Sequence, residues 1–257
     1  MYTYIYDSFL TEKKYENLLF RMEARLLELG INGRVEKLTL LKSMKEIVAD
    51  AVDRNSETVV VVGNDETVSK AISFLPAHKA VLGILPMGNN NSIADILGIS
   101  QGIEACDILS KRIIERIDLG KANGRYFLSR LVIQDAAHVT LDCNGFQVST
   151  QTPDGTVEIC NFSEASADDN DVFSNPQDGI LEAVIRPEIK KSWWQTFNKS
   201  YNRASVFPIK KLRIRSTGEN VTVLADGQTT LKTPVSIEIV PRELRVIVGK
   251  GRAFTRA

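Results

Sequence analysis

The stretch VVVVGNDETVSKAISFL, residues 59–75, decides how this chain is expected to fold. Its four consecutive valines lack the polar alternation of a half-exposed strand, so they predict a strand buried on both faces of a sheet. A glycine, an asparagine and two acids follow the valines, and apolar residues then return at helical spacing. A buried strand, a polar turn and a helix in this order are typical of a parallel sheet that is covered by helices.

The same alternation of strands and helices extends in both directions from this stretch, up to about residue 119. Strands are expected at residues 1–6, around Val35, at 58–62 and at 81–85, and helices at 11–29, 43–52, 66–75 and 92–97. Gly30 stands where a helix C-terminal cap belongs. We therefore expect residues 1–119 to form a three-layer α/β domain with a parallel sheet.

After residue 119 the pattern changes to short β-prone stretches separated by turns. Asn-Gly at 123–124 and 144–145 and Asp-Gly at 154–155 are hairpin turn signals. The stretches IKKLRIRS (209–216), VTVLA (221–225) and VSIEIV (235–240) alternate as half-buried antiparallel strands do. Residues 120–257 are therefore expected to form a β-sandwich domain, and a cleft between two such domains is a common location for ligands.

The composition is that of an ordinary globular protein. The 257 residues are 43% hydrophobic and 25% charged, and 32 basic residues balance 32 acidic ones. A net charge of zero gives no general attraction to polyanions, so no nucleic-acid partner is expected. The three cysteines show no metal-binding spacing and are expected to be reduced. The sequence shows no leader pattern and no apolar run of membrane length, so a cytoplasmic location is expected.

The first candidate site is the turn GNDET, residues 63–67, at the end of the valine strand. In open α/β sheets ligands bind at the carboxyl ends of the strands, and the N-terminus of a helix offers free N–H groups to an anion. Turns of this kind are common, and an ordinary turn in which Asp65 caps the following helix is the alternative.

The second candidate site is LPMGNNNS, residues 85–92, which follows the next buried strand. Its three asparagines supply side-chain amides and tolerate left-handed backbone angles, so the loop is suited to contact a sugar or a phosphate. The alternative is a polar turn in which Ser92 caps the next helix.

Together and in this order, the two loops resemble the diacylglycerol kinase catalytic-domain family, which includes bacterial lipid kinases and sphingosine kinases and is related to NAD kinases. That family has a G-G-D-G-T loop, followed by P-x-G-T-x-N-D-x-A and then L-G-I. The matching residues are Gly63, Asp65 and Thr67 in the first motif, and Pro86, Gly88, Asn91, Ala94, Leu97, Gly98 and Ile99 in the second. Later stretches also resemble family motifs: Cys160-Asn161, Pro176, DGIL at 178–181 and ADGQ at 225–228.

The resemblance implies an α/β domain followed by a β-sandwich, and an ATP-dependent kinase that phosphorylates a diacylglycerol-like lipid hydroxyl at the cleft between them. Phosphoryl transfer requires phosphate positioning, Mg²⁺ to neutralise charge, and a carboxylate that accepts the proton. Carried over by motif, Asp65 would lie by the phosphates and the metal, and Asp226 would be the base. The residues expected to bind the nucleotide are Gly63, Asn64, Asp65, Glu66, Thr67, Gly88, Asn89 and Asn91. Asp178 would hold a structural Mg²⁺, and a turn aspartate before Gly179 is the alternative.

The chain also departs from the family pattern. YDSF at 6–9 replaces the usual N-P-x-S-G loop, and Gln228 replaces the glutamate of D-G-E. Asn89 and Ser92 replace the threonine and aspartate of the second loop, and the sandwich lacks a glycine-rich segment and a helical insertion. Asn64 replaces a glycine of the first loop, where asparagine tolerates a positive φ better than most residues.

Glu66, in place of another glycine, is the most consequential change. A carboxylate about 4 Å from a phosphate oxygen costs on the order of 4 kcal/mol at an effective dielectric constant of about 20, which weakens binding roughly a thousandfold. Glu66 therefore turns outward, or helps to hold a metal, or ATP does not bind as it does in relatives.

Two functions remain open from the sequence: an active lipid kinase, and a catalytically degenerate relative that acts as a non-enzymatic binding or regulatory module. A nicotinamide-dinucleotide kinase is a distant third. The expected partners are a nucleotide and a small lipid or other hydroxyl acceptor, and a homodimer is left open. Peripheral contact with the inner membrane surface is also left open. Lys211, Arg213 and Arg215 on one strand face, and KKSWW at 190–194, suit a membrane, or else are a solvated face and ordinary packing.

Overall fold

The computed structural model forms two compact units. It describes residues 1–78, 80–134, 136–143, 145–150, 155–162, 174–186 and 204–254. Unit 1 comprises Met1–Ile117 and Arg242–Ala257, and unit 2 comprises Asp118–Pro241. The division expected at residue 119 assigned everything after it to the second domain. The last residues instead join unit 1, because the end of strand β16 (Val235–Ile247) pairs with a strand of that unit.

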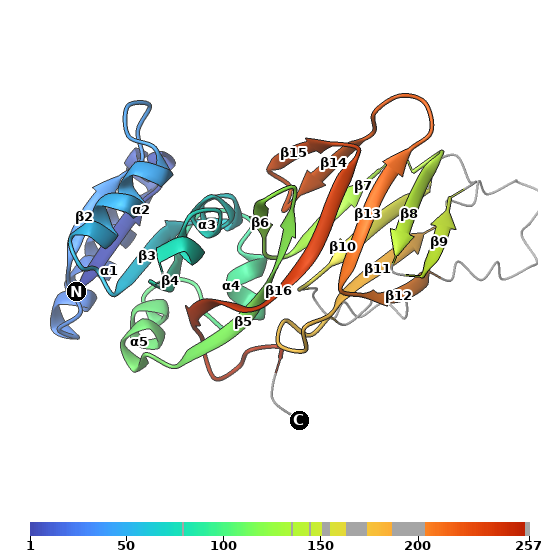
Figure 1. Cartoon of the computed structure of the whole chain (residues 1–257). Coiled ribbons are helices and arrows are strands. Elements are labelled where there is room, and N and C mark those ends of the chain that lie inside the picture. Colours follow the sequence, from blue (N-terminus) through green and yellow to red (C-terminus); the bar gives the residue numbers. More distant parts are fainter. Residues whose placement is uncertain are drawn as a thin grey trace, which may run out of the picture. The chain divides into compact units, whose positions relative to one another are not determined.

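Unit 1 is built on the predicted parallel sheet. Its strands are β1 (Tyr2–Tyr6), β2 (Arg34–Lys37), β3 (Thr58–Gly63) and β4 (Val81–Pro86). They lie in the order β2-β1-β3-β4, all parallel, and the end of β16 pairs parallel with β4 (Figure 1). All of β3 is buried, which confirms that the valine run forms a central strand covered on both faces.

Helices cover both faces of this sheet. They are α1 (Lys13–Glu28), α2 (Met44–Asp53), α3 (Asp65–Ile72), α4 (Ser92–Ile96) and α5 (Glu104–Lys111), with 3₁₀ turns η1 (Ser8–Thr11) and η2 (Leu75–His78). The chain moves one way along the sheet from β1 to β2 and the other way from β2 to β3, so right-handed crossovers place α1 and α2 on opposite faces. Accordingly, α1 contacts α5, and α2 contacts α3. None of the described helices is long and apolar enough to cross a bilayer.

The parallel arrangement has a consequence for the loops of unit 1. Because β1 to β4 all run the same way, the segments that follow them lie at one edge of the sheet, here named the carboxyl edge. These segments begin at Asp7, Leu38, Asn64 and Met87. Both candidate loops are therefore at this edge, together with the turn after β1 and the turn after β2.

Unit 2 is the predicted β-sandwich. One sheet contains β16, β13 (Lys211–Ser216), β8 (Val139–Cys143) and β9 (Phe146–Ser149) in that order, with the hairpin β5 (Ile114–Ala122) and β6 (Arg125–Phe127) alongside β16. The other has the order β12-β11-β10-β7-β14-β15. Its strands are β7 (Arg130–Ile133), β10 (Thr156–Cys160), β11 (Leu181–Arg186), β12 (Ser205–Ile209), β14 (Thr222–Ala225) and β15 (Thr229–Lys232). Alternate residues of both sheets meet in one apolar core.

The structure describes some of the turns predicted in this half and not others. Asn123 and Gly124 join β5 to β6 with φ values of 47° and 84°, which confirms the predicted hairpin turn. Asn144, Asp154 and the stretch at 190–194 lie outside the described residues.

The three cysteines are free, as the sequence predicts. Burial raises the pKa of Cys106 to about 11 and that of Cys160 to about 12, so both thiols stay protonated at neutral pH.

The β5–β6 hairpin has no room for a side chain at Gly120. Gly120 lies directly opposite Phe127, and a Cβ atom there would lie 2.0 Å from a ring carbon. The Phe127 ring is itself fully buried and fills the space that the glycine leaves.

We therefore expect Gly120→Ala to lower the free energy of unfolding by about 1–3 kcal/mol, because the ring must shift within a packed core. Gly251→Ala is the matched control, since a Cβ there meets no atom within 4 Å. Urea denaturation of both variants measures the difference, and equal losses would contradict this account of Gly120.

Candidate functional site

The two candidate loops meet at the carboxyl edge of unit 1. Gly63 and Pro86 are the last paired residues of β3 and β4. The N–H of Met87 donates to the carbonyl oxygen of Gly63 at 2.9 Å, and the N–H of Asp65 donates to the carbonyl oxygen of Asn90 at 2.9 Å. The loops that carry the two motifs are thus joined by backbone hydrogen bonds.

The carboxylate of Asp65 strengthens this junction. It accepts hydrogen bonds from the Ser92 N–H at 2.9 Å, the Ser92 hydroxyl at 2.6 Å and the Ile93 N–H at 3.0 Å. Asp65 therefore caps α4 from outside, and the two alternatives, in which Ser92 caps this helix or Asp65 caps its own helix, are wrong. Burial raises the pKa of Asp65, and the hydrogen bonds from Ser92 and Ile93 oppose that shift.

Asn64 and Gly63 shape the start of α3. The Asn64 side-chain oxygen accepts from the Thr67 N–H at 3.3 Å, so Asn64 is the N-cap. Its φ is −102°, so the left-handed backbone expected at this position is not needed. A Cβ at Gly63 would lie 2.5 Å from Thr67 Oγ1, and the glycine is required because the Thr67 side chain occupies that space.

An aspartate that the sequence analysis did not single out enters the site from the turn after β1. Asp7 Oδ2 lies 2.6 Å from the buried Thr67 hydroxyl, which donates to it. The Asp7 N–H donates to the carbonyl oxygen of Val62 at 3.0 Å, and this bond holds the turn against β3. Its position in the sequence could have identified it, because an acid directly after a parallel strand lies at the carboxyl edge.

An aromatic side chain from the same turn covers the second loop. Gly88 has a φ of +77°, and two Phe9 ring carbons lie 3.1 Å from the point where a Cβ would stand. Phe9 packs edge-on against Tyr15 of α1, with ring centroids 5.4 Å apart. The space beside Gly88 is therefore occupied by side chains of the turn after β1 and of α1.

The asparagines of the second loop have different surroundings. Asn91 is buried, and its side-chain amide donates to the carbonyl oxygen of Gly88 at 2.9 Å. Asn90 has a φ of +62°, which confirms that an asparagine takes a left-handed backbone here. Asn89 is exposed.

Glu66 turns outward, the first of the three outcomes expected for it. Its carboxylate pairs with the Lys70 ammonium one helical turn later at 2.7 Å, and both side chains are exposed. An exposed pair of this kind contributes at most about 1 kcal/mol, but it directs the charge away from the loops and neutralises it.

The donors at the start of α3 are largely satisfied within the chain. The N–H groups of Asp65, Thr67 and Val68 donate to Asn90 O, Asn64 Oδ1 and Asn64 O, respectively. In the described ranges, no group of three or more His, Cys, Asp or Glu side chains could hold a metal ion. In this arrangement the Asp7 carboxylate lies against the Thr67 hydroxyl and the Phe9 ring lies against Gly88, so the turn after β1 covers part of both motif loops.

In unit 2, Asp226 holds a turn together. Its carboxylate accepts the N–H groups of Leu128 at 2.8 Å, Ser129 at 2.8 Å and Arg130 at 3.1 Å. The expected base therefore has both oxygens engaged with the backbone. Gln228, which replaces the motif glutamate, is exposed.

The motif residues around Asp178 converge on a buried aspartate that sequence reasoning missed. Asp118 accepts the Gly179 N–H on its carboxylate at 2.7 Å, and its own N–H donates to the carbonyl oxygen of Pro176 at 2.7 Å. The Asn161 amide donates to the Asp118 carbonyl oxygen at 2.9 Å. Asp178 is exposed and accepts the N–H of Ile180 at 2.9 Å, as a turn aspartate does, and its proposed metal is untested.

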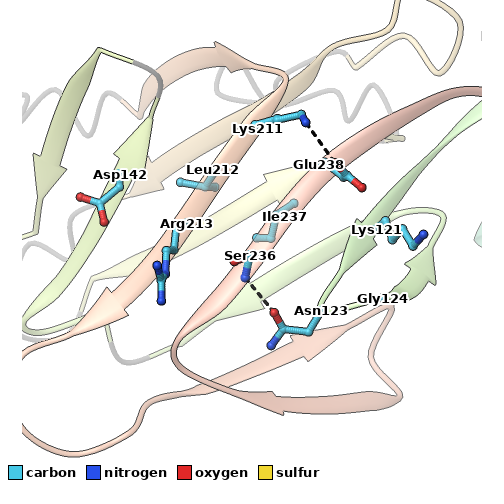
Figure 2. A pocket seen from close by; sticks show the side chains of 10 residues that line it. All are labelled: Lys121, Asn123, Gly124, Asp142, Lys211, Leu212, Arg213, Ser236, Ile237 and Glu238. Carbon is cyan, nitrogen blue, oxygen red and sulfur yellow. Dashed lines mark hydrogen bonds and ion pairs between the residues drawn. The ribbon is translucent and has the colours of Figure 1, made fainter.

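The basic strand face of β13 borders a hollow of about 530 Å³ in unit 2 (Figure 2). The lining residues are Lys121, Asn123, Gly124, Asp142, Lys211, Leu212, Arg213, Ser236, Ile237 and Glu238. Lys211 pairs with Glu238 at 3.4 Å, and Arg215 pairs with Asp142. Acids thus offset two of the three cations predicted on this strand, which favours a solvated face over a headgroup site.

Known proteins resemble this chain in sequence and in fold. Residues 2–122 match the model of the diacylglycerol kinase catalytic domain. Diacylglycerol kinases of Bacillus subtilis (strain 168) and Staphylococcus saprophyticus are 29% and 30% identical over 84 residues, which cover 31% and 32% of this chain but only 28% of each relative. A solved diacylglycerol kinase from Bacillus anthracis str. Sterne has a TM-score of 0.78 at 18% identity, with 97% of each chain covered. The predicted resemblance and the predicted fold are confirmed.

The cap on α4 generates one prediction. Asp65→Ala should lower the free energy of unfolding by about 2 kcal/mol, because the first turn of α4 loses its acceptor. Asp95→Ala removes an exposed carboxylate from the same helix and should cost less than about 1 kcal/mol. Urea denaturation compares them, and similar losses would show that charge near α4 matters more than the hydrogen bonds.

The turn held by Asp226 generates another. Asp226→Ala should lower the free energy of unfolding by about 2–4 kcal/mol, because three backbone N–H groups lose their acceptor. Asp178→Ala is matched to it, since Asp178 also precedes a glycine but accepts one backbone N–H, and should cost about 1 kcal/mol. Thermal or urea unfolding that leaves Asp226→Ala at wild-type stability would rule out the structural role.

Proposed function

We infer from the diacylglycerol kinase catalytic-domain match over residues 2–122 that this chain is an ATP-dependent lipid phosphotransferase, acting on a diacylglycerol-like hydroxyl. The observation that carries the proposal is the junction of the two motif loops at the carboxyl edge of a parallel sheet, where α/β proteins bind phosphates. ATP would supply the phosphoryl group there, and Mg²⁺ would neutralise its charge.

The chain's own residues supply positioning. Asp65 fixes the second loop and α4 against the start of α3, so the backbone of both loops is held as one surface. Gly88 and Thr67 are the positions on this surface that the turn after β1 now covers. In unit 2, Asp226 is the proposed base, and it has to take the proton with an oxygen that now accepts a backbone N–H.

Nucleotide binding therefore requires the turn that contains Asp7 and Phe9 to open. Ser8 is exposed and the Phe9 ring is only partly buried, whereas the next residue, Leu10, is buried, so opening that leaves Leu10 in place costs limited apolar contact. Opening would free the Thr67 hydroxyl and uncover Gly88.

A binding or regulatory module without catalysis is the second candidate. The contacts Asp7–Thr67 and Phe9–Gly88 favour it, because they cover the two motif loops with side chains of the chain itself and place a carboxylate beside them. In such a module the turn that contains Asp7 and Phe9 would stay closed over the two motif loops.

Calorimetric titration with ATP and Mg²⁺, combined with transfer of labelled phosphate to diacylglycerol in mixed micelles, separates the candidates. Binding together with transfer supports the kinase. A native chain that neither binds the nucleotide nor transfers phosphate, while Phe9→Ala does bind, would establish the closed module.

The acid in the turn after β1 gives a specific prediction. Asp7→Asn should raise the affinity for ATP about tenfold or more, because it removes a negative charge from the phosphate position and weakens the hold on Thr67. Glu66→Gln also removes one charge from the same edge. Glu66 faces Lys70, so its replacement should change the affinity by no more than about threefold.

The same calorimetric titration measures both variants. Equal gains from Asp7→Asn and Glu66→Gln would mean that general charge at this edge, and not the Asp7 contact, limits binding.

A further inference from the structure

Two leucines project into solvent at the tip of the turn that joins β2 to α2. The relative exposure of Leu40 is 106% and that of Leu41 is 95%, so both side chains are fully in solvent. Figure 1 shows this turn extending beyond the neighbouring α2. Adjacent leucines in water forgo the free energy of burial, so a surface that keeps them so prominent is suited to a partner.

The turn keeps its shape without any packing by these leucines. Thr39 and Lys42 exchange two backbone hydrogen bonds of 3.3 Å across it, and the Thr39 hydroxyl oxygen accepts the N–H groups of Leu41 and Lys42. At its base, the Lys42 ammonium lies 2.8 Å from the Glu36 carboxylate and 3.5 Å from that of Asp50. The leucines are therefore presented on a preformed turn.

Cations flank the exposed leucines. Lys37 ends β2 and Lys45 is the second residue of α2. Both are exposed, and neither forms an ion pair with any residue that the structure describes. Aliphatic side chains with lysines beside them match the anionic surface of a bilayer, where leucine enters the acyl boundary and lysine remains at the lipid phosphates.

The position of the turn relates it to the candidate site. It follows β2 at the carboxyl edge, where the two motif loops also lie. In the order β2-β1-β3-β4, two strand spacings separate β2 from β3, which is about 10 Å. A membrane that receives the leucines would thus face the edge at which phosphoryl transfer is proposed.

We propose that the turn at 37–45 is a docking tip for anionic membranes, with Leu40 and Leu41 inserted and Lys37 and Lys45 at the lipid phosphates. The choice of a lipid surface as the partner rests on the proposed function, because a lipid kinase must reach a substrate within a bilayer. The docking itself requires no nucleotide, so it is measured independently of catalysis.

The test is co-sedimentation of the full chain, without nucleotide, with vesicles of phosphatidylcholine alone or with about 30% phosphatidylglycerol. Leu40→Ser combined with Leu41→Ser should reduce binding to the anionic vesicles about tenfold or more. Lys37→Gln combined with Lys45→Gln should reduce it by a smaller factor and flatten its dependence on salt.

Phe20→Ser combined with Leu27→Ser is the matched control. These α1 side chains are 72% and 65% exposed and lie outside the tip, so their loss should leave vesicle binding unchanged. Unaltered melting temperatures confirm that the variants fold. An equal loss in the control, unchanged binding of the leucine variant, or no binding by the native chain would overturn the proposal. So would concentration-dependent self-association that disappears in the leucine variant, because a second copy would then be the partner.

Because phosphate transfer to micellar lipid is assayed separately, its failure would remove the proposed function and leave the vesicle result standing. Transfer without vesicle binding would support the proposed function and overturn the docking proposal.

Discussion

The carboxylate of Asp65 receives three hydrogen bonds from the first turn of α4, and the rest of the carboxyl edge depends on this contact. A helix of five residues has little stability of its own, so its start has to be fixed from outside. Asp65 fixes it from the neighbouring loop, 27 residues earlier in the chain. Its N–H also donates to the Asn90 carbonyl oxygen, so one residue sets the distance between the two motif loops.

Three acids of the motif loops and the turn after β1 have partners within the chain. Asp65 faces backbone and hydroxyl donors, Asp7 faces the Thr67 hydroxyl, and Glu66 faces Lys70. Lys70 already neutralises Glu66, whereas the carboxylates of Asp7 and Asp65 face neutral donors and keep their negative charge at the loops. An anion that approached these carboxylates would need movement of the chain or cations brought with it.

The sequence pattern predicted those parts of the structure that depend on residues close together in the chain. The valine run lies in β3 because apolar residues without alternation need cover on both faces, and Asn123-Gly124 forms a hairpin turn because both residues accept positive φ. β16 continues seven residues beyond the predicted end at Val240, through Pro241 and a left-handed Arg242, where a proline normally argues against a strand. The helix α5 was not predicted at all.

The contacts that define the site could not be predicted in this way. Asp7 and Thr67 are 60 residues apart, and their meeting depends on the order β1-β3, which no single segment encodes. The same holds for Phe9 over Gly88, where a ring from one loop occupies the space that a glycine in another leaves free. Motif residues were identified because of their type and spacing, whereas the groups that cover them were visible only after folding.

Strand β16 contributes its first residues to unit 2 and its last to unit 1. During synthesis, β4 therefore leaves the ribosome long before the residues of β16 that pair with it. One edge of β4 stays unpaired until the other strands of unit 2 have been made. A parallel strand edge left open for that interval is a template for unwanted pairing. The order of translation thus makes completion of the first domain conditional on the second.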